Sequence, residues 1–136
     1  KTMSYETNVD YLLEDKTVKD MCKIADVDAD ACKIAFLSAK QNCAETEDQS
    51  TSLVDVIPGQ DGNGIFSRQF FEKITNETSV EFTCSHFNLL EYGNYEDEHP
   101  ESLVIELQEK RKAIADFAKT IVVAEDTVVA SEPALE

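Results

Sequence analysis

The stretch of sequence that decides the fold is MCKIADVDADACKIAFLSAKQNC, residues 21–43. Its first residues belong to a helical pattern that runs from about residue 9 to residue 25. In the second half of this pattern, apolar side chains recur at spacings of three and four: Val18, Met21, Cys22 and Ala25. A capping-box pattern with Asp in place of Glu, Thr17-Val-Lys-Asp20, predicts that a helix restarts at Thr17. Short Asp side chains accept hydrogen bonds from the free N–H groups of a helix start. The run Asp26-Val-Asp-Ala-Asp30 therefore predicts a turn and the N-cap of a second helix.

This second helix is predicted over residues 29–43. One of its faces carries apolar side chains: Cys32, Ala35, Phe36, Ala39 and Cys43. Cys32 and Cys43 are eleven residues apart, which is about 16 Å along a helix axis. A disulfide requires Cα atoms within about 7 Å of each other. These two cysteines therefore cannot bond to each other within one helix.

A helical hairpin would bring Cys22 close to Cys32 across the aspartate-rich turn. We therefore predict the disulfides Cys22–Cys32 and Cys43–Cys84. The alternative pairing, Cys22–Cys43 with Cys32–Cys84, also avoids a bond within the second helix and stays open. Either pairing ties the N-terminal helices to the middle of the chain.

The cysteines also indicate a compartment. Four cysteines in a small chain, with no C-x-x-C pair, are typical of two disulfides in an oxidising environment. Asn76-Glu77-Thr78 is an N-glycosylation acceptor, a modification of surface segments in secreted proteins. Both features favour a secreted or extracellular protein, an ectodomain fragment included. The alternative is a cytosolic protein with four buried free thiols.

Beyond the hairpin, three further segments follow the same reasoning. Residues 53–57 are expected to form a short strand or a loop anchor, and apolar spacing predicts a helix over 65–75. Residues 80–92 fit a strand or a helix, and we favour a helix because a lone strand would have no partner. The longest helix is predicted over 101–123, directly after Pro100.

These elements predict the fold class: an all-α, four- to five-helix compact domain stapled by two disulfides, with a long C-terminal helix. The length of 136 residues suits one hydrophobic core. We assign residues 1–124 to a single helical domain. Residues 125–136 are expected to form a mobile acidic tail.

The composition excludes several partners. With 28 acidic and 12 basic side chains, the formal charge of −16 repels nucleic acid and anionic membrane surfaces. No run of 18 apolar residues is present, so we expect no membrane span.

The charge is unevenly distributed. Residues 74–109 contain nine acids and no Lys or Arg. Such a segment forms a solvated face or docks a protein partner with a basic face, where charge accelerates association. Its candidate contact residues are two tyrosines, as exposed Tyr is favoured at interfaces, and the acids beside them: Tyr92, Tyr95, Glu96, Asp97 and Glu98. This pattern favours a binding protein such as a surface antigen, soluble effector or cytokine-like helical protein.

The aromatic residues offer a second hypothesis. The phenylalanines at helical spacings could line an interhelical cavity for a small apolar ligand: Phe66, Phe70, Phe71, Phe87 and Phe117. The competing interpretation is that they form the solid core of a domain without Trp.

A weaker third hypothesis concerns calcium. The string Gln60-Asp-Gly-Asn-Gly-Ile-Phe66 resembles the centre of an EF-hand loop, with Gly64 at the sharp turn and Asp61 and Asn63 as candidate ligands. The entry carboxylate and the bidentate Glu of such a loop are both missing, so this loop alone would bind calcium poorly.

Catalysis is not expected. The chain has two His and no phosphate-binding, serine-hydrolase or metalloprotease motif. In Cys84-Ser-His86 the thiol and the imidazole would face different sides of a helix. We therefore predict neither an enzyme nor a cofactor.

Overall fold

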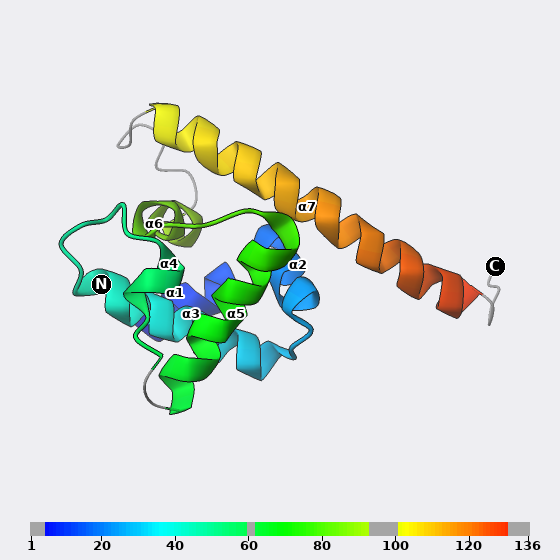
Figure 1. The fold of residues 1–136 in the computed structure, drawn as a ribbon, viewed down its shortest axis with the longest axis horizontal. Coiled ribbons are helices and arrows are strands. Elements are labelled where there is room, and N and C mark those ends of the chain that lie inside the picture. The colour runs from blue at the N-terminus through cyan, green and yellow to red at the C-terminus, as the bar shows by residue number, and fades with distance from the viewer. Residues whose placement is uncertain (1–4, 60–61, 93–100, 131–136) are drawn as a thin grey trace.

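The computed structural model describes residues 5–59, 62–92 and 101–130, with side chains described at 9–59, 62–91 and 101–121. The described residues form helices and no β-strand (Figure 1), which confirms the predicted all-α class. The helices are α1 (Tyr5–Leu12), α2 (Lys16–Ala25), α3 (Ala29–Ala44), α4 (Leu53–Val56), α5 (Gly62–Thr78), α6 (Cys84–Tyr92) and α7 (Glu101–Ala130). These seven exceed the four to five expected, because the region 9–25 divides in two and 53–57 contains a helical turn.

The division between α1 and α2 comes from one aspartate. Asp15 has an extended backbone, and its carboxylate accepts a hydrogen bond from the Thr17 N–H at 2.7 Å. Asp15 is therefore the N-cap, and the helix begins at Lys16. The predicted restart at Thr17 was thus close in position but wrong in its cap.

The aspartate-rich turn between α2 and α3 forms as predicted. Asp26 takes a left-handed backbone with φ of 62°, and its N–H bonds to the last carbonyls of α2. Asp28 is the N-cap of α3, where its carboxylate accepts from the Ala31 N–H at 2.9 Å. The turn brings Cys22 and Cys32 together with their Cα atoms 5.7 Å apart.

The second disulfide joins Cys43 to Cys84, with 5.4 Å between the Cα atoms. The predicted pairing is therefore confirmed, and the alternative pairing is wrong. The first bridge closes a hairpin of neighbouring helices. The second bridge links the end of α3 to the first residue of α6.

The middle segments differ from prediction mainly at their ends. Residues 53–56 form a single helical turn, capped by the Ser52 hydroxyl at 3.2 Å from the Val54 nitrogen, so the strand alternative was wrong. Helix α5 extends the predicted 65–75 in both directions. Helix α6 begins at Cys84, so the first four residues of the predicted range 80–92 are not helical.

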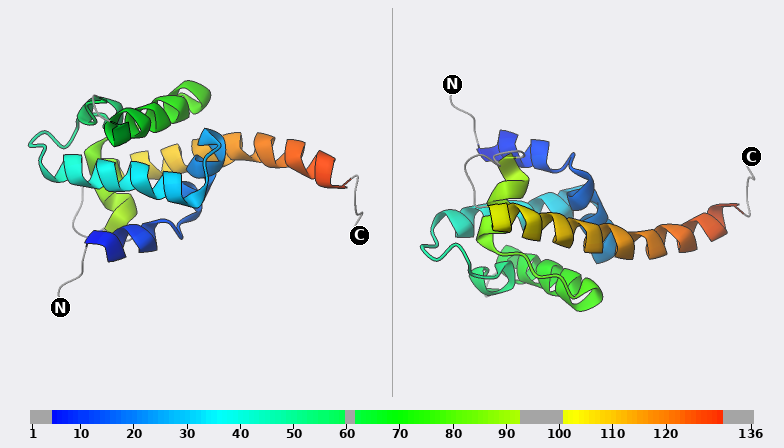
Figure 2. Two further views of the ribbon diagram at one scale, coloured as in Figure 1. Left: turned by 90° about the horizontal axis from the view of Figure 1, so that it is seen from below. Right: turned by 90° about the horizontal axis from the view of Figure 1, so that it is seen from above.

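Helix α7 is the longest and packs against α2, α5 and α6. It lies across one side of the other helices, and its last turns extend beyond them (Figures 1 and 2). It continues to Ala130, past the expected domain boundary at residue 124. The rest of the predicted tail, residues 131–136, lies outside the described residues.

The core is centred on Phe36 of α3, which is fully buried. Its ring contacts those of Phe70, Phe71 and Phe87, with centroids 5.5 to 5.9 Å apart. Burying one such side chain stabilises a fold by about 1.5–3 kcal/mol. This aromatic cluster therefore holds α3, α5 and α6 together beneath α7.

Candidate functional site

The most densely bonded polar region is where residues 49–53 run beside residues 82–85, which we call the junction. Leu53 donates its N–H to the Phe82 carbonyl at 2.7 Å, and Ser85 donates its N–H to the Gln49 carbonyl at 2.9 Å. Ser52 and Thr83 form an isolated antiparallel bridge. The junction thus fixes two segments together that lie far apart in the sequence.

Gln49 holds the loop side of the junction. Its amide nitrogen donates to the Cys43 carbonyl at 3.1 Å and to the Thr46 carbonyl at 2.7 Å. Its amide oxygen accepts from Asn88 of α6 at 2.8 Å. Together with the Cys43–Cys84 disulfide, Gln49 clamps the loop to the first turns of α6.

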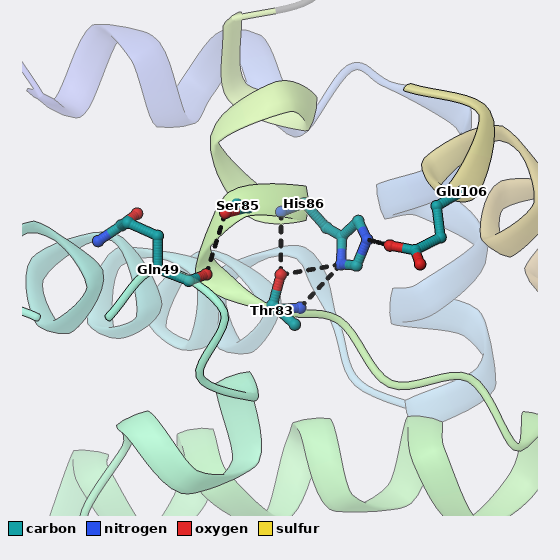
Figure 3. A network of polar contacts seen from close by, with 5 residues as sticks. All are labelled: Gln49, Thr83, Ser85, His86 and Glu106. Carbon is teal, nitrogen blue, oxygen red and sulfur yellow. Dashed lines mark hydrogen bonds and ion pairs between the residues drawn. The ribbon is translucent and has the colours of Figure 1, made fainter. Parts of the chain in front are cut away.

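Thr83 and His86 cap α6 reciprocally (Figure 3). The Thr83 hydroxyl accepts from the His86 N–H at 3.3 Å, while the Thr83 N–H donates to His86 Nδ1 at 3.1 Å. This is a capping box in which His replaces the usual Glu or Gln. Because Nδ1 accepts, the neutral imidazole carries its hydrogen on Nε2 and donates it to Glu106 Oε1 at 2.8 Å.

The surroundings of His86 favour this neutral form. Its side chain is 4% exposed, and burial lowers the pKa of His86 below its ordinary value of 6.5. The hydrogen bond and charge of Glu106 raise the pKa, and the charge of Lys110 lowers it further. His86 thus links α6 to α7 without a charge of its own at neutral pH.

A buried ion pair joins the far end of α6 to α3. Lys40 and Glu91 form it, with side chains 8% and 2% exposed. Burial lowers the pKa of the Lys40 ammonium, because desolvation disfavours the charged form. This cation lies inside the fold next to the base-free stretch, so it does not reduce the negative charge of the exposed surface.

Exposed carboxylates without an ion-pair partner occur in both base-free stretches of the chain. Most described basic residues pair with carboxylates elsewhere, as Lys33 does with Asp10 and Arg111 with Asp15. Eight exposed carboxylates of 41–59 and 74–109 have no ion-pair partner among the described residues. We call them the acidic surface: Glu45, Glu47, Asp48, Asp55, Glu77, Glu81, Glu101 and Glu109.

Hydrogen bonds stabilise the ionised form of one carboxylate of the acidic surface, that of Asp48. The Ser50 hydroxyl donates to its carboxylate at 2.6 Å and the Ser50 N–H donates at 3.0 Å. These hydrogen bonds hold the pKa of Asp48 below its ordinary value. The carboxylate therefore stays ionised to a lower pH than an ordinary aspartate does.

The predicted contact residues are only partly placed. Tyr92 is the last residue of α6. Tyr95, Glu96, Asp97 and Glu98 lie outside the described residues. The acidic surface thus rests on the flanking carboxylates. Its loop 45–48 belongs to a second base-free stretch, residues 41–67, and the contact of residues 49 and 51 with 84 and 85 could not be read from the sequence.

The predicted glycosylation site lies on α5. Asn76 is exposed two residues before the end of that helix. The hydroxyl of Thr78 donates to the Ile74 carbonyl at 2.6 Å and accepts from the Val80 N–H at 3.1 Å. The acceptor asparagine is therefore accessible, while the threonine of the motif closes the helix.

The phenylalanines proposed as a cavity lining pack mainly on one another. Phe70, Phe71 and Phe87 belong to the buried aromatic cluster, whereas Phe66 and Phe117 are half-buried at its edge. A separate groove of about 720 Å³ opens between α3 and the start of α5. Its lining includes Ile34, Leu37, Gln41, Asn42 and Pro58, and none of the five phenylalanines.

The calcium-loop resemblance is not reproduced in the described backbone. Asn63 and Gly64 already belong to helix α5, and Gly64 does not take the positive φ of a sharp turn. Asp61 lies outside the described residues. Among the described side chains, no three His, Cys, Asp or Glu residues converge to hold a metal ion.

Comparisons with known proteins place this chain near none of them. No family model matches it, and neither a curated protein nor a solved structure does. Over the described residues, no helix has the length and apolarity needed to cross a membrane.

Proposed function

We propose that this chain is a secreted or extracellular helical binding protein, not an enzyme, that engages a basic protein partner through its acidic surface. The observation that carries the proposal is the contrast in pairing. Several basic side chains of α2, α3, α5 and α7 have carboxylate partners, while the eight carboxylates of the acidic surface have none among the described residues. Such unpaired surface charge steers association with an oppositely charged partner.

The disulfides support the extracellular part of this proposal. Two bridges leave no free cysteine in the chain, as is usual in oxidising compartments. The exposed Asn76 supports glycosylation in the same setting. Intact mass of protein isolated without reductant tests both: we expect no free thiols and a mass excess that a glycosidase removes. Four free thiols would contradict the compartment.

The binding test compares two double variants that lose the same charge. Glu45→Gln with Glu47→Gln removes two unpaired carboxylates beside the junction. Asp26→Asn with Asp30→Asn removes two exposed carboxylates at the other end of α3, about 24 Å away along its axis. Neither pair contributes a side chain to the core, and Asn is tolerated in the left-handed backbone of residue 26.

The probe is an oligolysine peptide, titrated by calorimetry at low and physiological salt. We expect the first variant to bind it about fivefold more weakly, whereas the control changes by less than about twofold. Equal losses in both variants would show that net charge alone attracts the peptide. That result would remove the acidic surface as a site.

A second candidate function, carriage of a small apolar ligand, rests on the groove between α3 and α5. Its apolar residues Ile34, Leu37 and Pro58 face a volume large enough for such a ligand. Native mass spectrometry of gently extracted protein tests it. Bound ligand that is lost in Leu37→Gln would favour the carrier over the acidic-surface proposal.

A further inference from the structure

The cap of α6 depends on a group that can change its protonation. In an ordinary capping box, Glu or Gln accepts the N–H of the N-cap residue at any neutral or mildly acidic pH. Here His86 Nδ1 accepts the Thr83 N–H, and only a neutral imidazole has this acceptor. A single proton on Nδ1 therefore turns an acceptor into a donor that faces another donor.

A positive charge on the ring would be compensated by a carboxylate only on its Nε2 side. Glu106 of α7 faces Nε2 at 2.8 Å, and Lys110 of the same helix opposes a positive charge. The Phe82 ring packs against the imidazole with its centroid 6.2 Å away. The loop side offers Gln49 and Thr51, both neutral, which bond to Ser85 and Cys84. Glu106 can stabilise an imidazolium, but no neighbour replaces the lost acceptor of the Thr83 N–H.

We propose that His86 is a pH switch, whose protonation exchanges the Thr83–His86 cap for an imidazolium held by Glu106 and loosens the start of α6. The proton comes from solvent and adds to Nδ1, which then donates to the Thr83 hydroxyl 3.0 Å away. That hydroxyl also accepts the His86 N–H, so the added bond competes with the remaining half of the cap.

The effect reaches the junction, because Thr83 is its central residue (Figure 3). The carbonyl and amide groups on either side of Thr83 hold Leu53 and pair with Thr51. Loosening residues 82–84 therefore weakens the attachment of the loop that carries Glu45, Glu47 and Asp48. The switch is separate from the binding function and does not depend on the identity of any partner.

The test is NMR spectroscopy of the intact, disulfide-bonded protein between pH 7.5 and 4.5. At pH 7.5 the nitrogen shifts of His86 should report hydrogen on Nε2 alone. On acidification, ring protonation should be accompanied by an approximately fivefold loss of exchange protection at the Thr83 amide, the expected effect of removing one cap hydrogen bond. Protection in the helix interior of α3 should stay constant.

Three variants isolate the switch. His86→Gln keeps a capping-box acceptor but cannot titrate, so its Thr83 protection should not change with pH. His99→Gln removes the other His of the chain and should behave as the wild type. Glu106→Gln keeps an acceptor for Nε2–H and removes the compensating charge, so ring protonation should shift to lower pH.

Two results would overturn the proposal. One is hydrogen on Nδ1 at pH 7.5 in the wild type, a measurement that needs no variant. The other is the same pH-dependent loss of Thr83 protection in His86→Gln as in the wild type, because carboxylates elsewhere would then cause it.

Discussion

The α2–α3 hairpin and the junction are both closed by a disulfide, yet they are built differently. In the hairpin, Cys22 and Cys32 are 10 residues apart, and both helix ends are capped by aspartates of the same turn. In the junction, Cys43 and Cys84 are 41 residues apart, and the loop and α6 are held by side chains from different segments. The hairpin is a local structure, whereas the junction exists only once the chain has folded around its core.

The largest expected difference between the two regions is in the disulfides. A bridge stabilises mainly by restricting the unfolded chain, and the restriction grows with the closed loop. We expect Cys43→Ser with Cys84→Ser to cost about 4 kcal/mol and Cys22→Ser with Cys32→Ser about 3 kcal/mol. Urea denaturation of both double variants measures this. A larger cost for the hairpin bridge would contradict the comparison.

The next effect concerns the buried pair at the other end of α6. Lys40→Met leaves Glu91 uncompensated inside the fold, and we expect a loss of about 3 kcal/mol. Adding Glu91→Met should restore most of that loss, because two apolar side chains pack without a charge to desolvate. A thermodynamic cycle from denaturant unfolding measures the coupling. Equal stability of the single and double variants would show that the charge itself is not the cause.

Smaller effects are expected from the caps. Asp28→Ala removes one hydrogen bond at the start of α3 and should cost about 1 kcal/mol. Thr83→Ala removes the hydroxyl that accepts from His86 at the start of α6 and should cost a similar amount. The two variants should affect regions of different extent. Amide exchange should rise only within the hairpin for Asp28→Ala, but on both segments of the junction for Thr83→Ala. Exchange confined to α6 in the second variant would show that the loop is held independently.

The smallest effect is the pH dependence of stability due to His86. The pKa of His86 in the folded protein lies below 6.5, its ordinary value, which applies to the unfolded chain. At a pH between the folded and the unfolded pKa, the unfolded chain therefore binds more protons than the folded one. Unfolding free energy should therefore fall as the pH decreases through this window, and level off below the folded pKa. Chemical denaturation of the wild type against His86→Gln isolates this contribution. If the wild type instead gained stability relative to His86→Gln on acidification, the predicted direction of the pH dependence would be wrong.

The sequence predicted the hairpin well because its signals are local. Asp26 and Asp28 end one helix and start the next through hydrogen bonds to residues within four positions. The length of the helix between Cys32 and Cys43 excluded one disulfide pairing. The expected closeness of Cys22 and Cys32 across the turn favoured the observed pairing but left one alternative open. Residues 53–56 were less predictable, since their single helical turn depends on Leu53 being buried and bonded to Phe82.

The candidate site was predicted only in outline. The base-free stretch 74–109 indicated an acidic face, but its association with Glu45, Glu47 and Asp48 required the pairing of the two junction segments. The role of His86 was missed, although the spacing Thr83-x-x-His86 matches a capping box with an unusual last residue. Its contact with Glu106 comes from a helix 20 residues further on.

The sequence by itself therefore determined the helical class, the aspartate caps of the α2–α3 turn and the exclusion of a Cys32–Cys43 bridge, because these follow from contacts between near neighbours and from fixed helix dimensions. The tertiary structure alone decided that Lys40 is buried against Glu91, that a loop of carboxylates borders α6, and that an imidazole caps this helix. Each of these depends on which surfaces pack together. That choice is made by the aromatic core around Phe36, whose partners come from α5 and α6.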